Sequence, residues 1–318
     1  MAFRELVQPL RGIIAPMVTP LAAADELDVP GLERLVKHLV TGGVHGLFLL
    51  GTCGEGTSLS YRLRRELVDR VCRQVDGRIP ILVSVTDTSY VESVALAAHA
   101  ADAGADAVVV APPYYLPVDQ AELLAYVERL AGDVSLPVVL YNMPSLTKVE
   151  FEPATVRRLM DVEAIVGIKD SSGNLDYFQQ VRQLTRERPD WFLLMGPEHL
   201  LARAIALGGD GGVSGGANVC PQLFVQIYET AIAGQTDTLA GLVEQANLLG
   251  QIFGTETITA PSVIKGIKAA LSILGICNDL VAPPLACLIP SDRQRIAGVL
   301  ESLGPQAAYG GSKARLNC

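Results

Sequence analysis

Hydrophobic and polar positions follow a regular pattern along this chain, in which short apolar runs are separated by amphipathic segments. The apolar runs suit strands that are buried on both faces, and the segments between them repeat their apolar residues with helical spacing. Eight such units in one chain predict an α/β protein, a closed (β/α)8 TIM barrel. The predicted strands are residues 12–20, 46–51, 80–85, 107–113, 137–142, 165–170, 191–196 and 211–216.

The helical pattern continues after the eighth unit for longer than one barrel helix requires. We expect residues 1–235 to form the barrel and residues 236–305 to form a C-terminal helical extension of the same domain. Residues 306–318 are expected to be a mobile tail, because GGSKARLNC has no apolar period. The length of 318 residues is normal for one α/β barrel, and no linker-like composition divides the chain.

Composition excludes several classes of function. The formal net charge of −9 argues against a nucleic-acid partner. No apolar run approaches the roughly 18 residues of a membrane span. The N-terminal segment has neither an unbroken apolar region nor a cleavage site, so we expect a cytoplasmic protein. The six cysteines form no CxxC pair, and reduced thiols are expected in a chain with this much core material.

Basic and histidine residues give no sign of a metal or phosphate site. Residues 62–73 are rich in arginine, but their apolar positions have helical spacing, so the arginines are predicted to line the solvent-facing side of an outer helix. The four histidines have no ligand spacing with acidic residues, so no metal is expected. The glycines of 208–216 have no lysine or arginine among them, which disfavours phosphate binding.

The candidate chemistry lies at the carboxyl ends of the predicted strands, where barrel enzymes carry their reactive groups. Lys169 ends the apolar run IVGIKD, and Tyr141 ends VVLYN. A buried lysine can attack a carbonyl carbon, and a nearby phenol can pass the protons that imine formation requires. The alternative interpretation is that both residues are ordinary strand ends with their polar groups in water. The segment GTCGE, residues 51–55, could offer backbone N–H groups to a carboxylate.

Six motifs occur in the same order as in a known family. They are GIIAPMVTP at 12–20, GTCGE at 51–55, PYY at 113–115, YNMP at 141–144, GIKD at 167–170 and GGVSGGAN at 211–218. On these motifs, residues 10–300 resemble the pyruvate-dependent class I aldolases that include dihydrodipicolinate synthase and N-acetylneuraminate lyase.

This resemblance implies a catalytic set. Lys169 would form a Schiff base with the ketone of a 2-oxo acid, Tyr141 would shuttle protons, and Thr52 would link Tyr141 to Tyr115. In the family that last tyrosine crosses a tight dimer interface, so a homotetramer built as a dimer of dimers is expected. The covalent imine replaces any cofactor. The residues expected to bind substrate are Cys53, Gly54, Leu146, Ser171, Gly196, Glu198, Val213 and Gly215.

The sequence departs from its best-known relatives at the second-substrate positions. Leu146 stands where lysine-pathway synthases carry an arginine that grips a carboxylate, and leucine forms no ion pair. Sialic-acid lyases have acidic residues after strand seven and a serine in strand eight, whereas this chain has His199 after Glu198, and Gly215 at the serine position. The KDS and GGV–AN segments more nearly resemble aldolases for 4-hydroxy-2-oxo acids.

The sequence therefore predicts a lyase that cleaves or forms a carbon–carbon bond of a 2-oxo acid. Three alternatives stay open at this point: a deoxy-keto sugar acid dehydratase, dihydrodipicolinate synthase itself, and a non-catalytic homologue that only binds a 2-oxo acid.

Overall fold

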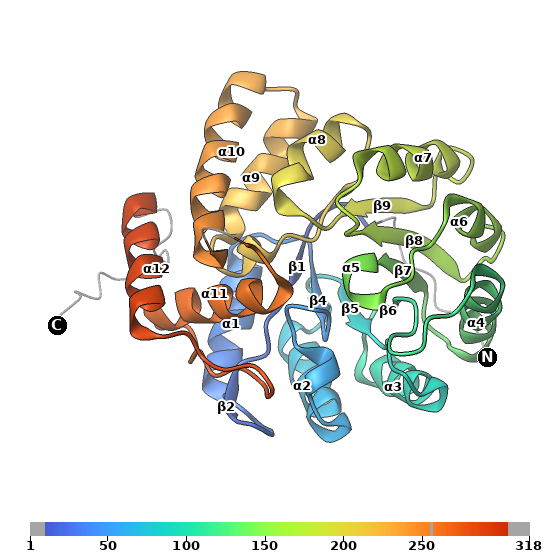
Figure 1. Ribbon diagram of the computed structural model, residues 1–318, viewed down its shortest axis with the longest axis horizontal. Coiled ribbons are helices and arrows are strands. Elements are labelled where there is room, and N and C mark those ends of the chain that lie inside the picture. The colour runs from blue at the N-terminus through green and yellow to red at the C-terminus, as the bar shows by residue number, and fades with distance from the viewer. Residues whose placement is uncertain (1–9, 255–256, 305–318) are drawn as a thin grey trace.

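The computed structural model describes residues 10–254 and 257–304 (Figure 1). Eight parallel strands close into a barrel in the order β1-β10-β9-β8-β7-β6-β5-β4, and helices surround it (Figure 1). The predicted (β/α)8 barrel is confirmed. Its strands are β1 Gly12–Pro16, β4 Gly46–Leu49, β5 Ile81–Ser84, β6 Ala107–Val110, β7 Val138–Asn142, β8 Ile165–Asp170, β9 Phe192–Met195 and β10 Gly211–Gly212.

The helices begin and end at residues that suit those positions. Asp119 and Glu122 form a capping box at the start of α4, and Gly104 ends α3 in the left-handed conformation that glycine adopts at little cost. The helices are α1 Val29–Thr41, α2 Tyr61–Val75, α3 Tyr90–Ala103, α4 Gln120–Asp133, α5 Pro144–Thr147, α6 Pro153–Leu159, α7 Leu175–Thr185, α8 Leu201–Ala206, α9 Pro221–Ile232, α10 Thr236–Gly250, α11 Ala260–Ile273 and α12 Pro290–Leu303.

The eighth strand is shorter than the sequence predicts. β10 ends at Gly212, and a 3-10 turn occupies residues 215–218. The backbone of β1 approaches β10 closely, since a Cβ on Gly211 would lie 2.0 Å from the carbonyl oxygen of Gly12. Glycine is therefore required for the barrel to close here, at the cost of a strand with no side chains of its own.

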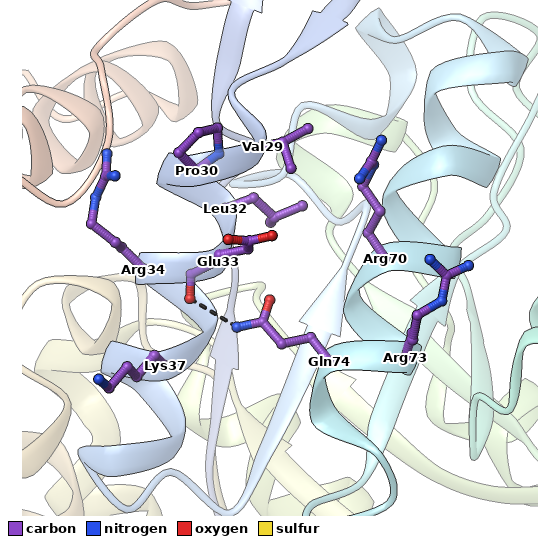
Figure 2. Close-up of a pocket in the computed structure, with 9 residues that line it drawn as sticks. All are labelled: Val29, Pro30, Leu32, Glu33, Arg34, Lys37, Arg70, Arg73 and Gln74. Carbon is purple, nitrogen blue, oxygen red and sulfur yellow. Dashed lines mark hydrogen bonds between the residues drawn. The ribbon is translucent and has the colours of Figure 1, made fainter.

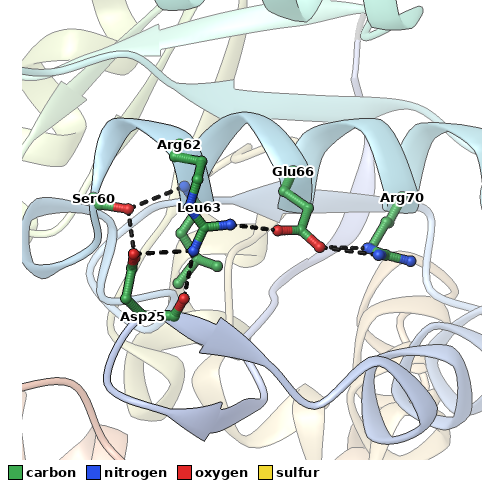
Figure 3. A network of polar contacts seen from close by, with 6 residues as sticks. All are labelled: Asp25, Ser60, Arg62, Leu63, Glu66 and Arg70. Carbon is green, nitrogen blue, oxygen red and sulfur yellow. Dashed lines mark hydrogen bonds and ion pairs between the residues drawn. The ribbon is translucent and has the colours of Figure 1, made fainter.

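A hairpin between β1 and α1 was not predicted. It consists of β2 Leu21–Ala23 and β3 Glu26–Leu27, which pair antiparallel. A chain of polar contacts fixes its turn to the start of α2, running from Asp25 through Ser60 and Arg62 to Glu66 and Arg70 (Figure 3). These groups are largely exposed, so solvent screens each ion pair and its contribution to stability is small.

The prediction that the arginines of residues 62–73 all face solvent is wrong for Arg64. Its guanidinium is buried, pairs with Asp87 at 2.8 Å and donates a second hydrogen bond to the carbonyl of Leu59. The helical spacing correctly predicted α2, but spacing cannot show that Asp87 lies where it can receive one of these arginines.

The barrel interior forms its own apolar cluster, separate from the larger core between barrel and helices. Ile14, Phe48, Phe192 and Leu194 are among its members. Gly167 in β8 makes room for Phe192, since a Cβ there would meet the Phe192 ring at 2.6 Å. An aromatic floor therefore lies inside the barrel just below the carboxyl end of β8.

The last three helices lie beside one another along one side of the barrel (Figure 1). α10 packs against α9, and α12 packs against α10 and α11. Within the described ranges, no helix is both long enough and apolar enough to cross a membrane. The predicted tail at 306–318 lies outside the described residues.

Candidate active site

Lys169 and Tyr141 are neighbours across two adjacent strands, because β7 and β8 run parallel with Tyr141 opposite Lys169. Both side chains are buried, with 6% and 5% of their surface exposed. The ammonium nitrogen of Lys169 lies 4.0 Å from the centroid of the Tyr141 ring and 5.0 Å from that of Phe48. No carboxylate among the described residues pairs with it. The alternative interpretation of Lys169 as a solvated strand end is therefore wrong.

The carboxylate next to Lys169 is turned away from it. Asp170 is fully buried and accepts hydrogen bonds from the Asn142 side chain at 3.0 Å and from the backbone and hydroxyl of Ser172. Burial raises the pKa of Asp170, although these hydrogen bonds oppose the shift. The Asn142–Asp170 contact joins the ends of β7 and β8, which fixes the spacing between Tyr141 and Lys169.

Thr52 lies on the far side of Tyr141 from Lys169, so the three polar groups follow one another. Its hydroxyl lies 3.1 Å from the Tyr141 hydroxyl, and either group can donate. In the described part of the chain, the backbone N–H groups of Thr52 and Cys53 have no hydrogen-bond partner. Two unpaired donors in the loop after β4 are suited to a carboxylate.

A cavity of about 660 Å³ opens over these groups at the carboxyl ends of the strands. Its walls come from β7, β8 and the loops after β4, β9 and β10, with the start of α11 on the remaining side. The predicted site residues that line it are Thr52, Cys53, Tyr141, Leu146, Lys169, Ser171, Gly196, Glu198, Val213 and Gly215.

Two predicted site residues do not line this cavity. Gly54 is buried beneath the loop, where its carbonyl accepts a 2.7 Å hydrogen bond from Thr19 and a Cβ would lie 3.0 Å from Met17. Tyr115 is 90% exposed and adopts a left-handed φ of 80°. A single copy of the chain therefore brings Tyr141 and Thr52 together but leaves Tyr115 on the surface.

The sequence interpretation missed one wall of the cavity. Met143 and Ser145 follow β7, and Phe253, residues 258–261 and Val263 belong to the C-terminal segment around the start of α11. Thr259 and Ser262 form a capping box at the start of α11, and Pro261 in its first turn is a helix-start signal visible in the sequence. That signal predicts where a helix begins, but not that the helix folds back over the barrel mouth.

Two glycines in the cavity lie close to neighbouring groups, and at Gly196 there is no room for a Cβ. A Cβ on Gly196 would lie 1.9 Å from the Ser171 hydroxyl oxygen. A Cβ on Gly215 would lie 3.3 Å from Ile267 and 3.6 Å from Val263, both on α11. Gly215 thus serves a helix contact as well as leaving space in the cavity.

Comparison with known proteins places the chain in a family. The model of the dihydrodipicolinate synthetase family matches residues 9–303. The chain belongs to this family. Its relatives in this family are named as synthases and aldolases, so the protein is an enzyme of the lyase and synthase class.

Three family members illustrate the similarity. The 4-hydroxy-tetrahydrodipicolinate synthase of Methanopyrus kandleri is 33% identical, over 93% of this chain and 97% of the relative. The solved dihydrodipicolinate synthase of Bacteroides thetaiotaomicron is 47% identical with a TM-score of 0.89, covering 93% of this chain and all of the other. YagE of Escherichia coli K12, a putative 2-dehydro-3-deoxy-D-gluconate aldolase solved with pyruvate, is 33% identical with a TM-score of 0.87, covering 92% of this chain and 98% of the other.

Glu198 lines the cavity at the barrel mouth, and the pKa of its carboxyl group is raised. One carboxyl oxygen accepts a 2.7 Å hydrogen bond from the backbone of Gly216, and the other is buried without a partner among the described residues. Burial raises the pKa of Glu198 to about 7, and the Gly216 hydrogen bond opposes the shift. Near neutral pH this group can therefore donate or accept a proton.

This raised pKa predicts a pH-dependent stability. Because Glu198 binds its proton more tightly in the folded chain, its contribution is fully present below about pH 4.5 and is lost as pH rises through about 7. One pKa unit corresponds to about 1.4 kcal/mol, so the free energy of unfolding should fall by at most about 3 kcal/mol between pH 5 and pH 8. Urea unfolding at both pH values measures it, with Glu198→Gln as the control. Equal pH dependence in both proteins would contradict the assignment.

Cys53 keeps its proton at neutral pH. Burial raises the pKa of its thiol to about 11, and the nearby Lys169 charge only partly opposes this. A protonated thiol is a poor nucleophile. Cys53 therefore lines the cavity as a neutral thiol rather than as a thiolate nucleophile.

Another cavity, of about 510 Å³, lies on the outside of the barrel between α1 and α2 (Figure 2). Arg34, Lys37, Arg70 and Arg73 give it positive charge, and Gln74 crosses it to donate to the carbonyl of Glu33. The residues that line it come from α1 and α2, away from the predicted strand-end residues.

Proposed function

We propose that Lys169 is the imine-forming residue and that the enzyme is an aldolase for a 4-hydroxy-2-oxo acid or deoxy-keto sugar acid. The observation that carries this assignment is the pairing of Lys169 with Tyr141 across β7 and β8, with Thr52 on the far side of the phenol. A buried amine without a carboxylate partner can attack a ketone, and the phenol beside it can carry the protons.

The steps balance without a cofactor. The Lys169 nitrogen attacks the ketone carbon, water leaves, and a protonated imine forms. For cleavage, the C4 hydroxyl loses a proton, the C3–C4 bond breaks, and its electron pair moves into the imine to give an enamine. An aldehyde leaves, C3 takes up a proton, and water releases pyruvate and the free lysine. Tyr141 would carry these protons, while the Thr52 and Cys53 amides hold the carboxylate.

The second substrate is proposed from the cavity wall. Leu146 is partly exposed and lines the cavity, and it offers no charge to the carboxylate of aspartate semialdehyde. Glu198 and Ser171 offer hydrogen-bonding groups to hydroxyls farther along the chain of a sugar acid. YagE, a putative 2-dehydro-3-deoxy-D-gluconate aldolase, shows that relatives of the chain include enzymes named for such substrates, while the uncharged Leu146 is what disfavours dihydrodipicolinate synthesis.

A homo-oligomer would complete the site. A cavity of about 390 Å³ borders Thr52 and Tyr141 on their other side and includes Tyr114. Tyr115 is exposed and does not line the site of its own chain. We therefore expect Tyr115 of the partner subunit to reach this cavity. The proposed assembly is a tetramer, and light scattering of the purified protein measures its mass.

Trapping with borohydride tests the imine. The protein is incubated with pyruvate, reduced, digested and analysed by mass spectrometry. We expect one pyruvate-derived adduct, on Lys169, and none without pyruvate. An absence of adduct from the folded oligomer would favour a non-catalytic binding protein. Once an adduct is found, the release of pyruvate from 2-oxo-3-deoxy acids separates an aldolase from a dehydratase, which would keep the carbon skeleton intact.

A further inference from the structure

A buried ion pair joins the Thr52 loop to the C-terminal helices. Glu55 is the last residue of GTCGE, and its carboxylate pairs with the ammonium of Lys268 on α11. The two side chains are 1% and 0% exposed. The second Glu55 oxygen accepts a 2.7 Å hydrogen bond from the backbone of Ala282, and Lys268 donates another, also 2.7 Å, to the carbonyl of Leu280.

The loop that carries Thr52 depends on this contact for its shape. Leu50 and Glu55, on either side of Thr52 and Cys53, both adopt left-handed φ values, 59° and 54°. Such conformations are unfavourable for residues other than glycine and persist only where surrounding contacts hold them. At the Leu50 end, the loop continues directly from β4. At the other end, the Glu55 side chain supplies a buried ion pair and a hydrogen bond to distant residues, beside the hydrogen bond from Thr19 to the Gly54 carbonyl.

The pair also joins two walls of the same cavity. Lys268 lies on α11, whose first residues Ala260, Pro261 and Val263 line the cavity opposite Lys169. Removing two charges from water is costly, and a buried apolar pair of similar size often stabilises a fold equally well. A buried ion pair does fix one geometry, because each charge must stay with its partner.

We propose that Glu55 and Lys268 are positioning residues for the reaction: they set where the Thr52 and Cys53 amides stand relative to Lys169. This rests on the proposed function, in which those amides hold the substrate carboxylate. The pair touches no reacting atom. Its loss shifts the loop, weakens carboxylate binding and loosens the Thr52–Tyr141 contact, while Lys169 and Tyr141 keep their places on β8 and β7.

The test variant is Glu55→Gln with Lys268→Met. It removes both charges together, so neither is left buried alone, and glutamine can still accept the Ala282 hydrogen bond. We expect a folded oligomer whose KM for pyruvate rises by about tenfold or more, with a smaller fall in kcat. At saturating pyruvate, borohydride still traps Lys169, but half-maximal trapping requires correspondingly more pyruvate.

Further variants separate positioning from stability. Glu55→Asp keeps both charges but shortens the side chain by one methylene. We expect its KM to rise by a larger factor than its kcat falls. Arg157→Gln with Asp161→Asn removes an exposed ion pair of α6 and its flank, and KM should not change. A folded double variant with the wild-type KM and trapping curve would overturn the proposal. If the wild-type protein itself gives no adduct, the proposed function has failed instead.

Should the double variant not fold, Glu55→Asp alone still decides. A folded Glu55→Asp enzyme with an unchanged KM for pyruvate would show that the reach of the side chain does not set the loop. A raised KM with a retained maximal trapping level would support the positioning role, because a purely structural defect would lower the trapped fraction at saturation.

Discussion

Lys169→Met is expected to lower kcat/KM by about 10⁴-fold or more and to abolish the borohydride adduct. The reason is that the amine forms the bond on which every later step depends. Methionine resembles the apolar part of lysine and can pack against Phe48 and Tyr141, which border the Lys169 side chain. The expected product is therefore a folded but inactive protein, and steady-state assays with circular dichroism measure both properties.

The matched control for this variant is Lys37→Met. Lys37 is exposed on α1, outside the barrel mouth, so its loss should leave both the adduct and kcat/KM unchanged. Full activity in Lys169→Met, or an adduct that moves to another lysine without loss of activity, would refute Lys169 as the nucleophile.

The barrel could be predicted from sequence because parallel strands buried on both faces give uninterrupted apolar runs. β8 was predicted at its observed bounds, Ile165–Asp170, since IVGIKD is apolar up to its last two residues. The end of β10 could not be predicted, because its glycines carry no periodic signal. The β2–β3 hairpin is too short for any periodicity and is held by contacts to α2, which are distant in sequence.

Much of the cavity could be predicted because a barrel brings its strand ends together. Lys169, Tyr141 and Thr52 lie near or just after strand ends, so the fold predicts that they face the barrel mouth, and the family resemblance predicts the Thr52–Tyr141 contact. The wall from α11 was missed, since nothing in residues 258–263 shows where that helix packs. Glu55 and Lys268 were missed for the same reason, as their pairing spans more than two hundred positions.

Tyr141 gives the second large expected effect, because its phenol, beside Lys169, is the proposed proton carrier. Tyr141→Phe keeps the ring that lies 4.0 Å from the Lys169 nitrogen and removes only the hydroxyl. General acid–base groups contribute about 10²–10⁴-fold, and we expect kcat to fall by about 10³-fold. Binding of the 2-oxo acid does not require the hydroxyl, so KM should change far less than kcat.

The control is Tyr177→Phe, which also deletes a buried hydroxyl. Tyr177 donates a 2.6 Å hydrogen bond to the carbonyl of Phe151 and does not line the cavity, so its loss should cost about 1–3 kcal/mol of stability without a large change in kcat.

Combining Tyr141→Phe with Thr52→Val completes the test. Since the two hydroxyls lie 3.1 Å apart, removing Thr52 should matter far less once Tyr141 is gone. Strictly additive losses would mean that the two hydroxyls act independently and would contradict a shared proton path.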